Sequence, residues 1–181
     1  MGTPAAIDVV SIEEYLSNPA YEHYEYIDGQ PVELNVGNKP HSTIQAACCA
    51  FLHPYLKARR LGYVAAELRC RLKVAGRTRF YLPGVSVILG PDDYSEIRFL
   101  DRAPDLVVEI RSPDDSLSFL LRKMNDYFAN GAKLAWLILP EERCVLVLGP
   151  NAPMRTVLPG ESLDGGEFLP DLQIPVDELF S

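Results

Sequence analysis

The chain has 181 residues, of which 48% are hydrophobic and 23% charged, and its formal net charge at pH 7 is −8. This composition predicts one globular domain over residues 1–181 and excludes a generally basic surface that coats nucleic acid, while a local basic groove stays open. No apolar run approaches the ~20 residues of a membrane span. The first residues lack the basic and apolar regions of a secretion signal, so we expect a cytoplasmic protein.

The first predicted elements are a short helix and a β-hairpin. Ser11 is expected to cap a helix that begins at residue 12, with Glu14 at its third position. Residues 24–27 and 31–34 predict two strands joined by a primed turn at Asp28-Gly29. Glu25 lies in the first strand, where an exposed side chain is the ordinary interpretation.

A long helix is predicted over residues 41–60, which have amphipathic spacing and a proline, Pro54, expected to bend the helix. His41 stands at its start. Helix N-termini favour anions, so His41 is either a structural residue or a contact for a phosphate group. The four cysteines have no CxxC spacing, and we expect small buried hydrophobic residues rather than a zinc site.

Two strands are predicted next, over residues 63–74 and 79–89. Glu67 interrupts the apolar character of the first strand, and Pro83-Gly84 lies in the middle of the second. The first of these strands is expected to be bent.

Residues 106–110, with the sequence LVVEI, are typical of a strand buried on both faces beneath helices. Glu109 lies inside this run. Burying a lone carboxylate costs roughly several kcal/mol unless a cation or metal compensates, so either residues 106–110 are not a buried strand or Glu109 carries its charge for a function. Strand alternation predicts Arg111 on the same face as Glu109. Asp105 is about 13 Å along the strand from Glu109, too far to share one ion, and is interpreted as a strand-entry residue.

The chain then continues with a helix over residues 117–130 and strands over residues 134–139 and 144–148. Lys123 falls just beside the apolar stripe of the helix. It is either an ordinary surface lysine whose stem lies on the core or a partner for Glu109 that steadies charge on a phosphate. This order of elements predicts an α/β (α+β) fold with a mixed central sheet, helices on both sides and an N-terminal β-hairpin extension.

Five segments together carry a family resemblance. They are HYEYIDGQPVEL from residue 23, VVEIRSPDDS from residue 107, K-M-x-x-Y-x-x-x-G from Lys123, WLILP from residue 136 and EFLPDLQIPVDELF from residue 167. In order and spacing they resemble the Uma-two family of restriction-endonuclease-like proteins, within the PD-(D/E)XK nuclease superfamily. The resemblance covers about the whole chain.

The resemblance implies a metal-dependent endonuclease that hydrolyses phosphodiester bonds in DNA with Mg²⁺ or Mn²⁺. It implies that Glu109 binds the metal, that Lys123 replaces the missing third-motif lysine, and that Glu25 approaches the active site. Arg111 occupies the E-x-K position and, because it stays charged, suits clamping a phosphate rather than donating a proton. By analogy, cutting both DNA strands needs two sites, so a homodimer is expected.

Two positions depart from the family: Leu139, where many relatives have an aspartate before the proline, and Gly84. Gly84 stands where the resemblance requires an aspartate as the first metal ligand. Glu67, on a neighbouring strand, is the best available substitute. The alternatives are that this chain no longer cuts, or that Gly84 was introduced into the sequence. A catalytically inactive nuclease-fold protein that binds nucleic acid or a protein partner therefore stands beside the endonuclease. Nothing in the sequence supports a small-molecule hydrolase, because it has no G-x-S-x-G, Walker or H-E-x-x-H motif.

Overall fold

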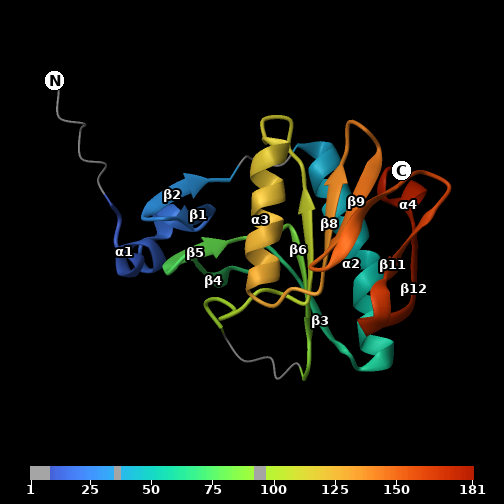
Figure 1. Ribbon diagram of the computed structural model, residues 1–181, viewed down its shortest axis with the longest axis horizontal. Coiled ribbons are helices and arrows are strands. Elements are labelled where there is room, and N and C mark those ends of the chain that lie inside the picture. The colour runs from blue at the N-terminus through green and yellow to red at the C-terminus, as the bar shows by residue number, and fades with distance from the viewer. Residues whose placement is uncertain (1–8, 35–37, 92–96) are drawn as a thin grey trace.

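The computed structural model describes residues 9–34, 38–91 and 97–181. Its centre is a six-stranded sheet with the order β10-β9-β8-β7-β6-β3 (Figure 1). Strands β7 and β8 are parallel and the other neighbours are antiparallel, so the predicted mixed sheet is confirmed. The strands are β3 (Gly62–Ala66), β6 (Val85–Leu89), β7 (Leu106–Ile110), β8 (Leu134–Leu139), β9 (Cys144–Gly149) and β10 (Ala152–Val157).

Helices α2 (Lys39–Arg59) and α3 (Leu117–Ala129) cover opposite faces of this sheet; in Figure 1, α3 lies in front and α2 behind. Alternation along β7 explains this arrangement. Val108 packs in one core cluster with Leu52 of α2, whereas Val107 packs in another with Met124 of α3. The central strand is thus buried on both faces, as the LVVEI run predicted.

A second sheet of four strands, with the order β2-β1-β5-β4, stands beside the central one (Figure 1). It consists of β1 (Tyr24–Ile27), β2 (Gln30–Glu33), β4 (Cys70–Val74) and β5 (Arg77–Tyr81). The predicted N-terminal hairpin is therefore present, but it is part of a larger sheet. Its primed turn is also confirmed, because Asp28 and Gly29 have φ values of 52° and 96°.

The two long strands predicted over residues 63–74 and 79–89 are wrong. Each is broken in the middle, and its halves belong to different sheets. Glu67 has a left-handed φ of 51°, which ends β3. Pro83 has no N–H to donate, which separates β5 from β6. The chain therefore crosses from one sheet to the other twice, once between β3 and β4 and once between β5 and β6.

Side-chain caps set where helices α1 and α2 begin. Helix α1 (Ile12–Ser17) is capped by Ser11, whose Oγ accepts the Glu14 N–H at 3.1 Å, as predicted. Helix α2 begins two residues earlier than predicted, because Asn38 Oδ1 accepts the His41 N–H at 3.1 Å and so caps the helix. A 3₁₀ turn, η1 (Pro19–Tyr21), follows α1.

The C-terminal residues form a layer on α2. They comprise β11 (Ser162–Gly165), η2 (Gly166–Phe168), β12 (Leu169–Pro175) and α4 (Val176–Leu179). Leu163 and Ile174 share a core cluster with Leu52, and Tyr55 Oη donates to Pro170 O at 2.6 Å. This segment therefore packs over a helix. Within the described ranges, no helix has both the length and the apolar character needed to cross a membrane.

Candidate active site

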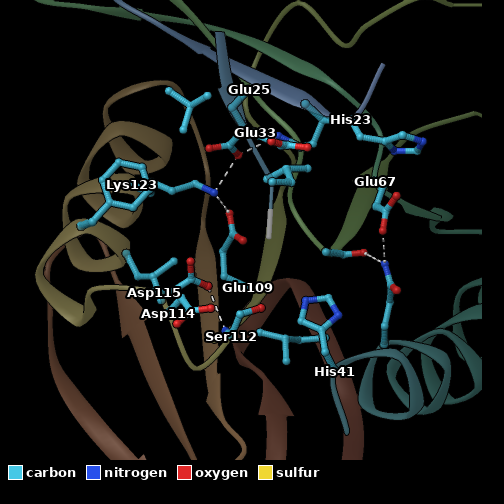
Figure 2. A pocket seen from close by; sticks show the side chains of 18 of the residues that line it. His23, Glu25, Glu33, His41, Glu67, Glu109, Ser112, Asp114, Asp115 and Lys123 are labelled. Carbon is cyan, nitrogen blue, oxygen red and sulfur yellow. Dashed lines mark hydrogen bonds and ion pairs between the residues drawn. The ribbon is translucent and has the colours of Figure 1, made fainter. Parts of the chain in front are cut away.

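A cavity of about 740 Å³ lies where the two sheets, the start of α2 and the loop between β7 and α3 meet. Its polar lining is acidic. The cavity is lined by the carboxylates of Glu25, Glu33, Glu67, Glu109, Asp114 and Asp115, together with Lys123, His23, His41 and Gln45. Figure 2 shows the Lys123 ammonium pointing between Glu25 and Glu109, with Glu67 on the opposite side of the cavity.

Three charged side chains form a buried cluster at one end of this cavity, and each comes from a different element. Lys123 Nζ of α3 lies 2.8 Å from Glu25 Oε1 of β1 and 2.7 Å from Glu109 Oε1 of β7. The exposed fractions of these residues are 3% for Lys123, 2% for Glu25 and 7% for Glu109. The structure therefore brings together three of the residues singled out in the sequence, and Lys123 is a buried partner of Glu109 rather than a surface lysine.

Further hydrogen bonds hold the two carboxylates. Tyr127 Oη donates to Glu109 Oε1 at 2.7 Å, and the Leu82 N–H donates to Glu25 Oε1 at 3.0 Å. All these contacts use the Oε1 atoms. Within the part of the chain that the structure describes, neither Oε2 atom accepts a hydrogen bond. Each carboxylate therefore keeps one oxygen for a cation or a water molecule.

The cluster holds two carboxylates and one ammonium, so it carries one negative charge in excess when all three are ionised. Burial raises the pKa of Glu25, and so does the charge of Glu109, while Lys123 opposes this rise. Burial alone would lower the pKa of Lys123, but the two carboxylates outweigh it and raise that pKa above its ordinary value. Lys123 thus stays protonated, and Glu25 is the carboxylate whose ionised form burial disfavours.

This arrangement predicts a pH dependence for Glu25. Its pKa is higher in the folded chain than in the unfolded chain, where it is about 4.3. Between the two values the folded state binds more protons, so the free energy of unfolding falls as pH rises from the unfolded value towards the folded one. Glu25→Gln cannot ionise and should lose this fall. Urea unfolding of both proteins between pH 4 and pH 8 checks it; parallel profiles would contradict the assignment.

Gly84 and Glu67 lie in line with Glu109 on adjacent segments of the central sheet. Val85 pairs with Val108 of β7 and with Ala66 of β3, so the next position on each segment brings Gly84 beside Glu109 and Glu67. The Glu67 N–H, 3.4 Å from Gly84 O, continues this register. Gly84 lines the same cavity as Glu109, and a Cβ at this position would meet Val108 O at 3.3 Å and the Ile110 side chain at 3.8 Å.

Glu67 is not placed as a partner for Glu109. Its backbone lies two strand spacings away, about 10 Å, and its exposed side chain accepts a hydrogen bond of 3.4 Å from Gln45 Nε2. Gln45 Nε2 also donates to Gly84 O at 2.9 Å, which holds it beside this segment. Across the described residues, no three His, Cys, Asp or Glu side chains form a group that could hold a metal ion. The Glu67 side chain is held by Gln45 rather than by the cluster around Glu109.

Arg111 does not stand beside Glu109 as strand alternation predicted. Strand β7 ends at Ile110, and the Arg111 Nη1 atom lies 3.0 Å from Glu142 Oε1. The residue lines a neighbouring cavity of about 310 Å³ rather than the one that contains Glu109. The alternation rule fails here because Arg111 lies one residue beyond the end of β7, in the loop that leads to α3.

His41 does line the cavity, in the first turn of α2, and its backbone N–H is already bonded to Asn38. The sequence interpretation missed Tyr127 and Gln45. The ring of Tyr127 is typical of the apolar face of the helix, although the position of Tyr127 four residues after Lys123 places both side chains on one side. Nothing in the local pattern distinguishes Gln45 from other polar residues on α2.

The interpretation of Asp105 as a strand-entry residue is confirmed. Asp105 is buried at the start of β7 and forms ion pairs with Lys133 at 3.0 Å and Arg102 at 2.9 Å. Burial opposes ionisation, but the Leu89 N–H and these two cations hold the pKa of Asp105 below its ordinary value. The charge of Asp105 is therefore neutralised by structural ion pairs, outside the cavity that Glu109 lines.

Comparison with known proteins identifies a family and a similar solved structure. A family model described as "Uma2: Putative restriction endonuclease" matches residues 12–177. A crystal structure described as "a putative nuclease belonging to DUF820" from Anabaena variabilis aligns with a TM-score of 0.81 and 26% sequence identity, covering 94% of this chain and 97% of that one. It confirms the restriction-endonuclease-like fold. No curated protein matches the chain.

Proposed function

The chain belongs to the Uma2 family of restriction-endonuclease-like proteins, and from this premise we propose that it is a metal-dependent endonuclease for DNA whose activity is impaired by Gly84. The observation that carries the proposal is the buried Glu25–Lys123–Glu109 cluster at the end of an open cavity. Two of the three charges would suffice for an ordinary buried ion pair. The third, unbalanced carboxylate supports a role toward a cationic group.

The described residues fit a divalent ion only in part. Glu109 has a free Oε2 atom at the cavity, and Mg²⁺ is often held by one or two carboxylates with water and a substrate phosphate. Glu67 is the other carboxylate of the proposal, but it is bonded to Gln45, and Gly84 has no side chain to add. Glu109, with Glu67, would hold Mg²⁺ or Mn²⁺ loosely. A bound ion would supply charge compensation at the phosphate and a more acidic water.

The chain's own groups suggest what the site does to a substrate. Lys123 lines the cavity and has three N–H donors, of which the two carboxylates use two. Because its pKa is raised, it remains a fixed positive charge and would stabilise negative charge that develops on a phosphate rather than give up a proton. Tyr127 and Lys123 together fix the Glu109 carboxylate, so its second oxygen is directed by the protein.

A catalytically inactive protein that binds nucleic acid or a protein partner is the second candidate. Gly84 favours it, and so does the lining of the cavity, where six carboxylates face one lysine that is already paired. Such a surface repels phosphate groups unless cations are present. Double-strand cleavage would need two copies of the site, so a homodimer is part of the first proposal and not of the second.

A plasmid-nicking assay tests the proposal. We expect the chain to nick supercoiled plasmid slowly with Mn²⁺ or Mg²⁺ and not at all with EDTA. Glu109→Gln should reduce this rate by at least about 100-fold, because it removes the charge that faces the cavity. Glu13→Gln, an exposed acid on α1, is the matched control and should cut like the parent chain. Equal rates for the Glu109 variant and the parent would remove the proposed site; no cleavage by either would favour the binding protein.

A further inference from the structure

The contact between Glu25 and Lys123 depends on how the N-terminal hairpin is docked. Glu25 belongs to β1, and Lys123 lies 98 residues further along the chain. Strand β1 aligns with β5 at one residue pair, Tyr26 with Phe80, so few backbone contacts fix its position. A side chain that contacts both the hairpin and α3 would therefore control the geometry of the cluster.

Arg79 of β5 makes both contacts with one guanidinium group. Its Nε and Nη2 atoms donate to the two carboxylate oxygens of Asp28 at 3.0 and 2.8 Å, and its Nη1 atom donates to Asp126 Oδ2 at 2.7 Å. Asp28 follows Glu25 by three residues at the hairpin turn, and Asp126 follows Lys123 by three residues, about one helical turn. The ion pairs of Arg79 therefore run beside the Glu25–Lys123 contact.

Tyr81 completes this connection from the same face of β5, two residues further on. Its Oη donates to Asp126 Oδ2 at 2.6 Å, and its ring centroid lies 5.0 Å from Lys123 Nζ. The hydrogen bonds from Arg79 also lower the pKa of Asp28, so that carboxylate stays ionised. Arg79 is only 21% exposed, which limits screening of its charge by solvent.

We propose that Arg79 is a positioning residue of the candidate site: by holding the hairpin turn and helix α3 on one planar guanidinium, it sets Glu25 against Lys123. The relevance of this role to DNA cleavage rests on the proposed function, whereas the effect of Arg79 on the position of Glu25 does not. Lysine cannot replace arginine here, because a single ammonium lacks the fixed fork that binds Asp28 through two bonds and Asp126 through a third.

Chemical accessibility of Lys123 tests the claim without DNA or metal. The protein is treated with acetic anhydride under native conditions, and acetylation of each lysine is followed by peptide mass spectrometry, with exposed Lys57 as internal reference. In the parent chain Lys123 should be protected. Arg79→Met should acetylate Lys123 at least tenfold faster, and Arg79→Lys should also lose protection. Arg77→Met is the matched control and should change nothing, because Arg77 is 69% exposed and 3.7 Å from Asp28.

Global unfolding is separated from local misplacement by a second variant. Leu172→Ala in the C-terminal layer lowers stability far from the cluster, and it should leave Lys123 protected below its melting temperature. If Arg79→Met does not fold, Asp126→Asn removes the α3 half of the connection and should give the same exposure. Protection of Lys123 equal to that of the parent chain, in a folded Arg79→Met or Asp126→Asn protein, would overturn the proposal. Failure to cut DNA would count against the nuclease alone.

Discussion

Replacing Gly84 with aspartate should raise plasmid cleavage by about 100-fold or more with Mn²⁺ or Mg²⁺, because it adds a second carboxylate beside Glu109. The register of β6 and β7 carries this expectation, since position 84 adjoins Glu109 and lines the same cavity. Gly84→Asn has the same shape without the charge and is the matched control. It should cut no faster than the parent chain.

The aspartate also has a structural cost that gives a second measurement. A Cβ at position 84 would lie 3.3 Å from Val108 O, so the strand must shift slightly, and the new charge joins an acidic cavity. We therefore expect Gly84→Asp to melt at a lower temperature than the parent in EDTA, and to gain more from Mn²⁺ than either the parent or the asparagine variant, by binding linkage. Efficient cutting by the parent chain would show that Gly84 is not a missing ligand. No gain on Gly84→Asp, in rate or in melting temperature, would remove the metal site.

Replacing Lys123 with methionine should destabilise the fold by about 3–5 kcal/mol, because it leaves two buried carboxylates with no cation between them. The deficit should shrink in acid, where the two carboxylates become protonated. At high pH the sign follows from the raised pKa of Lys123: its contribution is complete below the unfolded value of about 10.4 and is lost as pH rises through the folded value. The difference between parent and variant should therefore begin to close in strong alkali.

Urea unfolding can be followed by the fluorescence of Trp136, the single tryptophan, which is fully buried. Arg122→Met changes the neighbouring exposed position on α3 and should stay within about 0.5 kcal/mol of the parent. A Lys123→Met deficit below about 1 kcal/mol, or one that does not change with pH, would mean that Lys123 does not neutralise the cluster in solution.

Much of the fold could be predicted from local patterns. The LVVEI run predicted the central strand. The Ser11 helix cap and the Asp28-Gly29 turn were also predictable, because their geometry depends on neighbouring residues alone. The breaks near Glu67 and Pro83 were visible as irregularities. Their consequence was not predictable, because the transfer of β4 and β5 to another sheet depends on pairing with β1, which is distant in sequence.

The candidate site divides in the same way. Glu109 could be found from the sequence because an acid inside an apolar strand violates a local rule, and the structure gives it buried partners. Arg111 was misplaced because alternation assumes that a strand continues, and β7 ends at Ile110. Tyr127 was hidden by its apolar ring, which fits a core position whether or not its hydroxyl binds a carboxylate.

The long interval between Glu25 and Lys123 has a kinetic consequence. Contacts between residues so far apart form only after a large loop has closed, and the entropy of closure is lost before the contact returns any stability. Until then Lys123 and Glu109 must remain hydrated or balance each other without Glu25. Arrival of the first hairpin should therefore be a late event in refolding, and it would add the excess negative charge to a Lys123–Glu109 pair that is neutral until then.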